Sequence, residues 1–443
     1  MSVRGKAFIA GAYEHPLRTI PNKTVQQVHA EVAAGALADA GLSFSDVDAY
    51  FCAGDAPGFG ALSMAEYLGL ELTHIDNTET GGSSYLLHAQ HAAEAIAAGH
   101  CHVALITLAG LPRSSGAGIG GAGRFGSAPE VSFENFFGLS IVAGYAMAAR
   151  RHMYEFGTTS EQLAEIKVAA ASHAQHNPNA FLQNAVTIEE VLQSKMVADP
   201  LHMLDCCVVT DGGGALVVVS PEVARKLSRQ CVPVLGTGFA VKHVNNGRID
   251  LTHTGAVVSG PRAFAEAGLT PSDIRYASIY DSFTITVLTT LEDLGFCEKG
   301  KGGEFVSNGA LQAPFGKLPF NTDGGGLCNN HPSNRGGITK VIEAVRQLRG
   351  EHQVPVLQGF LRLLGKPPRD IVLGLRLHAQ GAVIGSTQIL GRLHQLLLQE
   401  LNPVLRCRSL LDHLRHHLHL RYPTRSHHRH RLQQPVLQHR LIR

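Results

Sequence analysis

Short apolar runs alternate with Ala-rich amphipathic segments over the first two-thirds of this chain, and this alternation limits its fold more than any other feature. Residues 6–12 and 102–110 are short runs of small and β-branched apolar residues. Residues 24–41 and 83–99 instead repeat their apolar residues at helical spacing. Strands interleaved with helices are typical of an α/β protein built around a mainly parallel sheet, and we predict that fold class here.

Other segments continue the pattern. Short apolar runs predict three more strands at residues 47–54, 232–241 and 276–280. Residues 135–176 have the periodicity and length of two helices. At residues 206–220, apolar residues on both sides of three glycines predict a hairpin of two strands joined by a glycine turn.

Two stretches of the chain are similar to each other, which indicates an internal duplication. AGALADAGLSFSDVDAYFCAG (34–54) and RAFAEAGLTPSDIRYASIYDS (262–282) both contain an Ala-rich helix, a Gly-Leu turn, a Ser-Asp pair and an apolar strand. We therefore expect two similar halves, residues 1–228 and residues 229–351. Residues 352–443 have no counterpart in this scheme.

These last residues differ sharply in charge from the rest. Residues 352–443 hold 13 Arg and one Lys against three acidic side chains, a net charge of +11, whereas residues 1–351 have a net charge of −9. Three interpretations are open: a disordered basic extension, a His-rich metal-binding tract, and a stretch produced by a shift of reading frame. The abrupt change in composition favours the frame shift. The histidines at 416–430 lack ordered ligand spacing, so we expect no metal site there.

Composition predicts the cellular location of the protein, the state of its cysteines and whether it binds nucleic acid. No apolar run reaches the ~20 residues needed to span a bilayer, and the first residues lack the pattern of a secretory signal. We therefore expect a cytoplasmic protein without a membrane segment. The eight cysteines are scattered, which favours free thiols over disulfides or a metal site. A single basic run without a recognised module is weak support for nucleic-acid binding, and we expect none.

The first candidate site segment is ETGGSSYLLHAQHAAEAIAAG (79–99). It places Gly82, Ser83 and Ser84 where a strand turns into a helix, so that backbone N–H groups and the positive helix end face a ligand. An oxyanion or a nucleophile would be stabilised there. A helix cap and tight turn explain the same residues equally well.

The second segment is YDSFT (280–284), at the carboxyl end of a predicted strand, where ligands bind in α/β sheets. Tyr280 is a candidate acid/base group, although a tyrosine of pKa ~10 needs local help to act as a base. The alternative is a buried tyrosine with one hydrogen bond.

The third segment is LPFNTDGGGLCNNHPSNRGGITKVIEAVRQLRG (318–350). Its glycines allow close backbone approach, His331 precedes a proline in an extended loop, and a helix begins near Ile338. His331 is a candidate oxyanion donor or acid/base group. A structural histidine is the alternative.

Together the three segments resemble the thiolase superfamily in order and spacing. Residues 318–350 resemble its glycine-rich stretch ending in Gly-His-Pro, and YDSF resembles its Asn-Glu-Ala-Phe motif. IAAGHCHVALI (96–106) resembles the helix and strand after its nucleophile, and TDGGGALVVVS (210–220) resembles its Asp-Gly-Ala-Ala hairpin. The resemblance covers residues 5–350. It implies a five-layered αβαβα fold of two similar halves, usually dimeric, with a coenzyme A thioester bound at their junction.

The departures from the family are equally informative. Gly82 occupies the place of the acylated cysteine, Tyr280 that of the asparagine, and the second catalytic cysteine is not found in the tail. Only His331 keeps the family's residue type. This combination resembles the branch of lipid-transfer and acetyl-CoA acetyltransferase-like proteins. Some members are aldolases of steroid side-chain coenzyme A thioesters that share the tyrosine and work with a small OB-fold partner.

Three functions follow from this resemblance. The first is cleavage or formation of a carbon–carbon bond by retro-aldol chemistry, with Tyr280 as acid/base group and His331 in the oxyanion site. The second is acyl transfer through Ser83 or Ser84, and the third is a non-catalytic subunit that binds acyl-CoA or lipid. The acyl-CoA is expected as substrate, without a bound cofactor, in a homodimer with an OB-fold partner. The residues expected to bind the substrate are Gly82, Asp281, Gly325, Gly326 and Asn330.

Overall fold

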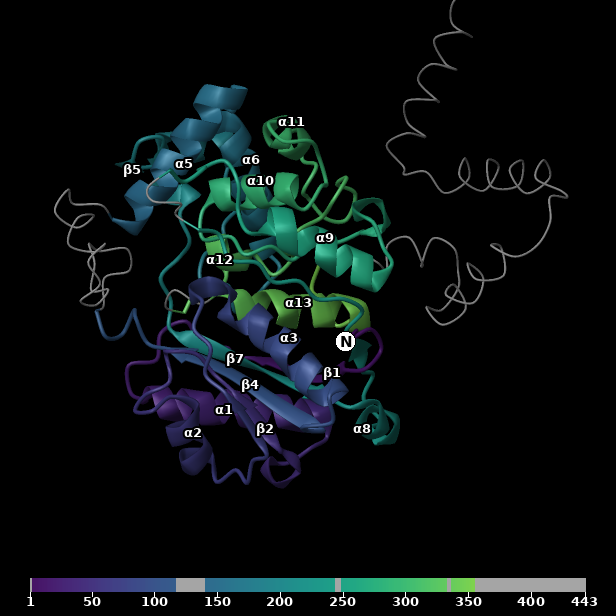
Figure 1. Ribbon diagram of the computed structural model, residues 1–443. Helices are drawn as coiled ribbons and strands as arrows, with labels where there is room; N and C mark the ends of the chain where they lie inside the picture. Colours follow the sequence, from purple (N-terminus) through teal and green to yellow (C-terminus); the bar gives the residue numbers. More distant parts are fainter. Residues whose placement is uncertain (1, 117–139, 244–247, 333–335, 355–443) are drawn as a thin grey trace, which may run out of the picture. The chain divides into compact units, whose positions relative to one another are not determined.

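The structure contains a six-stranded sheet whose strands lie between residues 8 and 233 (Figure 1). The computed structural model describes residues 2–116, 140–243, 248–332 and 336–354. From one edge to the other the strands are β3 (His74–Asp76), β2 (Ala49–Phe51), β4 (Val103–Gly110), β7 (Gly212–Val219), β1 (Phe8–Glu14) and β8 (Val232–Pro233). The predicted strands at 6–12, 47–54 and 102–110 correspond to β1, β2 and β4. The tail interpretations lie outside the described residues beyond position 354, and the boundaries of the two halves stay predictions.

The sheet is mixed, and the prediction of a mainly parallel sheet is wrong. β2 runs parallel to β3 and β4, but β7 is antiparallel to both β4 and β1, and β8 is antiparallel to β1. Every residue of β4 and β7 is buried. A strand buried on both faces is apolar throughout whichever way it runs, so its sequence does not reveal its direction.

Helices cover both faces of this sheet (Figure 1). Successive residues of β7 point to opposite faces: Val217 packs with α1 (Val25–Ala40) and α2 (Ala61–Leu68), and Val218 packs with α3 (Ser84–Ala97) and α13 (Gly337–Arg349). The helices predicted at 24–41 and 83–99 and from Ile338 are therefore confirmed.

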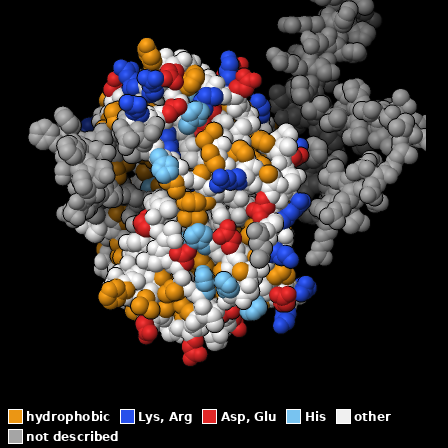
Figure 2. Space-filling model, in the orientation of Figure 1, with side chains coloured by type: hydrophobic (Ala, Val, Ile, Leu, Met, Phe, Trp, Pro, Cys, Tyr) orange, Lys and Arg blue, Asp and Glu red, His pale blue; other side chains and the backbone are white. Residues whose placement is uncertain are grey.

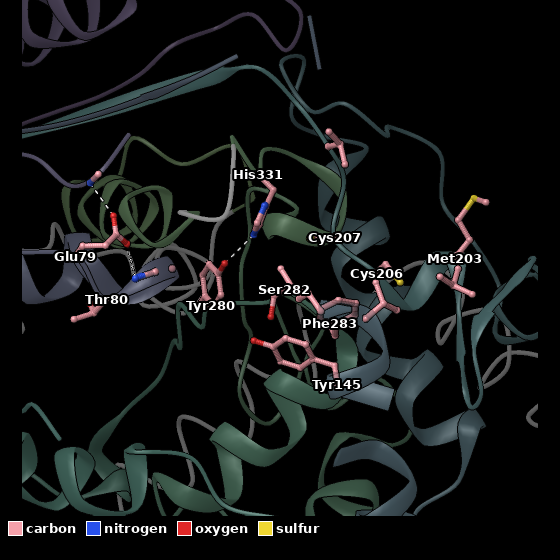
Figure 3. Close-up of a pocket in the computed structure, with 17 residues that line it drawn as sticks. Glu79, Thr80, Tyr145, Met203, Cys206, Cys207, Tyr280, Ser282, Phe283 and His331 are labelled. Atoms are coloured by element: carbon pink, nitrogen blue, oxygen red, sulfur yellow. Dashed lines mark hydrogen bonds between the residues drawn. The ribbon is translucent and has the colours of Figure 1, made fainter. Parts of the chain in front are cut away.

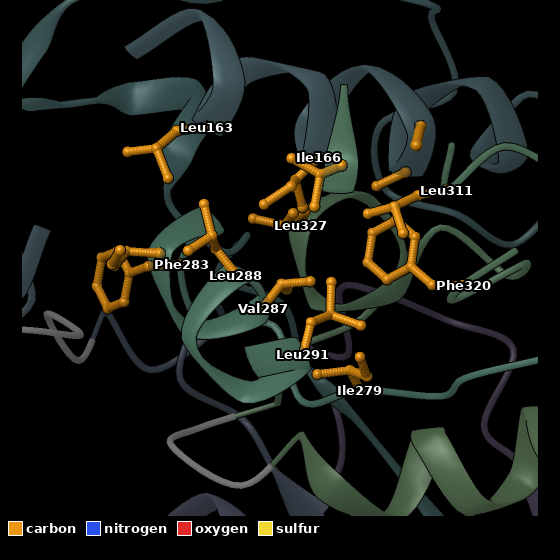
Figure 4. Close-up of a cluster of buried hydrophobic side chains, with 14 of the residues drawn as sticks. Leu163, Ile166, Ile279, Phe283, Val287, Leu288, Leu291, Leu311, Phe320 and Leu327 are labelled. Carbon is orange, nitrogen blue, oxygen red and sulfur yellow. The ribbon is translucent and has the colours of Figure 1, made fainter. Parts of the chain in front are cut away.

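A second helical core lies beyond α3 and α13 (Figure 4). The remaining helices and strands are α5 (Ile141–Phe156), α6 (Ser160–Ala174), α7 (Ile188–Gln193), β5 (Met196–Ala198), β6 (Leu201–His202), α8 (Pro221–Lys226), α9 (Ala256–Ala267), α10 (Thr284–Asp293), α11 (Gly302–Val306) and α12 (Gly325–Cys328). Leu163 and Ile166 of α6 pack there against Leu288 of α10 and Leu327 of α12. The two helices predicted within 135–176 are α5 and α6.

The two similar sequence stretches fold alike. α1 ends at Gly41 and α9 ends at Gly268, and both glycines have the left-handed conformation. A short 3₁₀ turn follows each helix, and the side chains of Ser43 and Thr270 take part in a capping box at the start of these turns. The helix-and-turn unit that the sequence indicated to be duplicated is therefore present at both places.

The predicted hairpin at 206–220 is wrong. Residues 212–219 form the single strand β7, and among residues 206–211 only Cys206 and Thr210 form β-bridges, both isolated and both to other segments. A Cβ at Gly213 would lie 2.3 Å from the carbonyl oxygen of Leu108 on β4. The glycines therefore permit close pairing between β7 and β4 and do not form a turn.

Of two other predicted strands, one is shorter than expected and the other does not form. Of residues 232–241 only Val232–Pro233 form a strand, β8. Residues 276–280 form no strand; within the described ranges their only bridge joins Ala277 to Phe320. The side-chain amide of Asn321 instead accepts from the Ile279 N–H and donates to its C=O, both at 2.8 Å. A side chain thus satisfies backbone groups that a neighbouring strand would otherwise pair.

Acidic and basic side chains are interspersed with small apolar groups over the face shown in Figure 2. No helix in the described part of the chain combines the length and apolar character needed to cross a membrane. Seven cysteines lie in the described ranges and all are free thiols, as predicted, whereas Cys407 lies outside these ranges.

His173 makes stability depend on pH. It is 1% exposed near the end of α6, its Nε2 accepts the Ala313 N–H at 2.8 Å, and burial lowers its pKa to about 4. Because the pKa of a histidine in the unfolded chain is ~6.5, the unfolded state binds the proton first as pH falls. We expect the wild type to lose about 3 kcal/mol more than His173→Gln between pH 7.5 and pH 4. Urea unfolding at both pH values measures this difference, and equal losses in the two proteins would contradict it.

Candidate active site

The three predicted segments meet at one cavity of about 900 Å³ (Figure 3). Gly82 comes from the turn before α3, Tyr280 from the segment before α10, and His331 from the loop after α12. The described lining residues are Gly54, Glu79, Thr80, Gly81, Gly82, Ile141, Val142, Tyr145, Val197, Met203, Cys206, Cys207, Val209, Tyr280, Ser282, Phe283 and His331. Residues that are 249 positions apart in the sequence, from Gly82 to His331, therefore face one space.

Tyr280 and His331 form a hydrogen-bonded pair in this cavity. The Tyr280 hydroxyl lies 2.9 Å from His331 Nε2, and Figure 3 shows the two side chains pointing toward each other. His331 is 2% exposed, and its backbone N–H donates to Thr210 Oγ1 at 2.9 Å, which fixes the backbone of the loop at this residue. An imidazole at this distance can share the phenolic proton, which is the local help that a tyrosine needs for acid/base chemistry.

Gly82 lies directly beneath the Tyr280 ring. A Cβ at this position would be 2.3 Å from Tyr280 Cζ and 2.5 Å from its hydroxyl oxygen. Any side chain at position 82 would therefore overlap the tyrosine where it now lies. A nucleophilic side chain at position 82 and the Tyr280 ring in its present position would therefore exclude each other.

Two further glycines, which the sequence interpretation missed, complete the contact. A Cβ at Gly336 would lie 3.0 Å from His331 Cδ2 and 3.3 Å from Tyr280 Cε2, and one at Gly337 would lie 2.3 Å from the Gly82 carbonyl oxygen. The signal was the adjacent Gly-Gly pair just before the helix, which is more than a helix start needs. These glycines let α13 approach the turn before α3 closely.

The steric coupling between Gly82 and Tyr280 is testable. Gly82→Ala should lower the free energy of unfolding by about 1–3 kcal/mol, because the new methyl group must displace the tyrosine ring. Adding Tyr280→Ala removes the ring and should make the alanine at position 82 nearly neutral, so a double-mutant cycle should show strong coupling. Additive effects in chemical denaturation would show that the two positions do not compete for space.

Ser83 and Ser84 form hydrogen bonds within the turn before α3, and Ser83, the N-cap residue, makes no side-chain capping bond to the helix. Ser83 is exposed, its hydroxyl donates to the Thr80 carbonyl at 3.2 Å, and it faces a second cavity of about 650 Å³ between α3, α13 and α9. Ser84 is fully buried; its hydroxyl donates to the Gly81 carbonyl and accepts the Thr80 N–H, both at 2.8 Å. Within the described ranges neither hydroxyl is hydrogen-bonded to an imidazole. The Ser84 hydroxyl also lies 3.4 Å from the Glu79 carboxylate, but Ser84 is fully buried and neither serine lines the main cavity, so the geometry does not favour either as an acyl-transfer nucleophile.

Asp281 is buried behind the cavity. Its carboxylate accepts the N–H groups of Gly326 at 2.8 Å and Leu327 at 3.1 Å, and it forms an ion pair with Lys340 at 3.0 Å. Gly325 has a φ of +61°, and a Cβ there would lie 2.1 Å from the Asp281 carboxylate. Asp281 thereby holds the start of α12, the helix that leads into the His331 loop.

Asn330 lies in a buried polar network beside the same loop. Its amide accepts from the Thr210 hydroxyl at 2.8 Å and donates to Glu14 at 3.0 Å. Burial alone would raise the pKa of Glu14, but Arg18 and Arg346 lower it to about 2. Asp281, Gly325, Gly326 and Asn330 are absent from the described residues that line the cavity, so the structure places them as supports of His331.

Cys206 and Cys207 also line the cavity, and sequence analysis did not place them there. Both are half-buried, and burial raises the pKa of each thiol to about 12. Both are therefore protonated near neutral pH and are poor nucleophiles. In the described ranges no group of three or more His, Cys, Asp or Glu side chains is arranged to hold a metal ion.

Comparison with known proteins places this geometry in a family. Residues 238–358 match the model of the Thiolase C-terminal domain-like family. The chain is 37% identical to a steroid side-chain-cleaving aldolase of Thermomonospora curvata, over 78% of this chain and 91% of the relative. It is 35% identical to the 17-hydroxy-3-oxo-4-pregnene-20-carboxyl-CoA lyase of Mycobacterium tuberculosis, over 84% and 99%.

Two solved structures of the same superfamily are also similar to this chain. The Ltp2-ChsH2(DUF35) aldolase superimposes with a TM-score of 0.72 at 34% identity, over 79% of this chain and 92% of that one. Human mitochondrial 3-ketoacyl-CoA thiolase shares the fold, with a TM-score of 0.57 at 14% identity over 79% and 94%. The thiolase α/β fold expected from the sequence is confirmed. This chain belongs to the aldolase-like branch of the thiolase superfamily.

Proposed function

We propose that the protein cleaves a β-hydroxyacyl-CoA by a retro-aldol reaction, with a bulky, steroid-like group on the β-carbon. The observation that carries this proposal is the Tyr280–His331 pair, held at 2.9 Å directly over Gly82. The pair supplies proton transfer at a site where an acyl-cysteine has no room. Relatives with 35–37% identity are named for this kind of reaction, as an aldolase and a CoA lyase.

The reaction needs a base, an oxyanion site and no covalent intermediate. Tyr280 removes the proton of the β-hydroxyl, whose oxygen becomes a ketone as the bond between the α- and β-carbons breaks. The bonding electron pair moves onto the thioester as an enolate, which takes a proton at the α-carbon. The products are a ketone and a shortened acyl-CoA, and no oxidant or reductant is consumed.

His331 has two tasks in this scheme. Its Nε2 shares the proton of the Tyr280 hydroxyl, which lowers the cost of forming a phenolate. As the enolate develops, the imidazole faces the thioester oxygen and supplies a hydrogen bond to it. The backbone N–H groups at the start of α3, next to Gly82, can add to this oxyanion site.

The proposal includes a partner protein, an oligomeric state and a cellular location. The similar aldolase of known structure carries a second protein, ChsH2(DUF35), in its name. We propose that this chain likewise works with a small partner of the OB-fold type, as a homodimer in the cytoplasm. Coenzyme A enters as part of the substrate, without a separate bound cofactor.

A product assay tests the function. The purified chain, with and without the partner protein, is incubated with a β-hydroxyacyl-CoA that bears a steroid side chain, and the products are separated by chromatography and mass spectrometry. The expected result is one ketone and one shortened acyl-CoA in equal amounts. Free coenzyme A as the sole thiol product would point to hydrolysis and would reject the proposal.

A non-catalytic subunit is the second candidate, because the cavity has room for a large ligand but lacks a reactive thiolate. In this case the same assay would show tight binding of the acyl-CoA and no products with any partner. An acyl-enzyme at Ser83 or Ser84 would appear as added mass on the intact protein under turnover.

A further inference from the structure

The main cavity has two chemically different ends. The groups around the reaction centre are polar and belong to Glu79, Thr80, Tyr280 and His331. The other end is formed by apolar side chains, and Figure 3 shows Tyr145 and Phe283 beside each other, with Met203 farther from the Tyr280–His331 pair. The described residues of the apolar end are Ile141, Val142, Tyr145, Val197, Met203 and Phe283.

Two aromatic rings form the wall nearest the reaction centre. The rings of Tyr145 on α5 and Phe283 at the start of α10 have centroids 4.3 Å apart and planes tilted by 30°. Both residues pack against the buried core of α6 and α10, which includes Leu163 and Leu288. The wall is therefore backed by a close-packed core and presents a firm apolar surface to the cavity.

No charged side chain interrupts the apolar end within the described lining residues. The neighbouring thiols of Cys206 and Cys207 are protonated, because burial raises their pKa to about 12. Transfer of an apolar acyl group from water to such a surface is favourable. The phosphates and ribose of coenzyme A would lose their hydration there without gaining hydrogen bonds, which is costly. The apolar end therefore suits the acyl group and excludes the coenzyme.

We infer that the Tyr145–Phe283 wall binds the bulky apolar part of the acyl group and that Tyr145 determines the preference for bulky over short substrates. This inference rests on the proposed function for the reaction but concerns binding alone. A short acyl group ends near Tyr280 and does not reach the wall. A fused-ring group extends past Tyr280 and lies flat against the two aromatic rings.

The test measures binding of two unreactive probes, cholanoyl-CoA and acetyl-CoA, by isothermal titration calorimetry. Neither probe has a β-hydroxyl, so neither can be cleaved. Tyr145→Ala should raise the Kd of cholanoyl-CoA about 10- to 100-fold, because apolar contact area is lost. Its Kd for acetyl-CoA should change by less than about twofold. Tyr145→Phe should resemble the wild type, because within the described ranges the Tyr145 hydroxyl makes no hydrogen bond.

The chain offers a matched control on the same helix. Tyr154 on α5 is 84% exposed and lies outside the cavity, so Tyr154→Ala removes the same side chain without touching the wall. Leu348→Ala trims the second cavity in the same way. If Tyr145→Ala weakens both probes equally, or if Leu348→Ala alone weakens cholanoyl-CoA, the inference is wrong.

Failure of the inference can be told apart from failure of the proposed function. Binding is measured without turnover, so a selectivity change at Tyr145 in a protein that never cleaves a β-hydroxyacyl-CoA would reject only the retro-aldol function. Normal cleavage of a steroid substrate by Tyr145→Ala, with an unchanged KM, would reject only the role of the wall.

Discussion

Tyr280→Phe should lower kcat for β-hydroxyacyl-CoA cleavage by about 10²- to 10⁴-fold, the usual contribution of a positioned acid/base group. The substitution removes one oxygen atom and keeps the ring that covers Gly82. The partner of His331 Nε2 at 2.9 Å is lost, and with it the group that takes the proton of the β-hydroxyl. KM should change little, because the apolar wall and the rest of the cavity are intact.

Steady-state kinetics with the partner protein present measure this effect. Tyr154→Phe serves as the control, since it makes the same chemical change at a residue that is 84% exposed and remote from the cavity. Melting temperatures of both variants should match the wild type. Full activity in Tyr280→Phe would remove the assigned acid/base role, even if cleavage itself were confirmed.

Lys340→Met should lower the free energy of unfolding by about 3–5 kcal/mol, the cost of leaving a buried carboxylate without its counter-ion. The Lys340 and Asp281 side chains are 2% and 1% exposed, and their charged atoms are 3.0 Å apart. Burial alone would lower the pKa of Lys340, but Asp281 raises it above its ordinary value, so the lysine is charged. Methionine keeps the volume of the lysine stem but leaves Asp281 unpaired in the interior.

Chemical denaturation provides the measurement. Lys301→Met is the control, because Lys301 is 61% exposed and its ion pair with Glu304 is 3.5 Å long; it should cost less than about 0.5 kcal/mol. Adding Asp281→Asn to Lys340→Met should recover part of the loss, since it removes the unpaired charge. Similar losses at Lys340 and Lys301 would show that burial of the pair adds nothing.

Local sequence patterns were sufficient for most helices. Thr24 starts α1 with a hydrogen bond from the Gln27 N–H, and Gly41 ends it in the left-handed conformation, as the residue types predict. The same helix, glycine and short turn recur at α9, so the duplication was visible in the sequence. These features depend on residues within a few positions of one another.

Strand pairing was the least predictable part of the fold. Gly212–Gly214 were interpreted as a hairpin turn, yet they begin β7, because the missing side chains let β7 pair closely with β4. The segment before Tyr280 was interpreted as a strand, yet the side chain of Asn321 satisfies its backbone. In both places the deciding partner lies about 40 to 100 residues away along the chain.

For the site, the sequence by itself determined which chemical groups are available: a tyrosine, a histidine and a glycine where a nucleophile would stand. Only the tertiary structure decided that Tyr280 covers Gly82, that Gly336 and Gly337 leave room for this contact, and that Tyr145 and Phe283 form an apolar wall. The physical reason is the separation along the sequence between the residues that determine each feature. Turns and helices are set by neighbouring residues, whereas overlap and packing depend on atoms that only folding brings within a few ångströms.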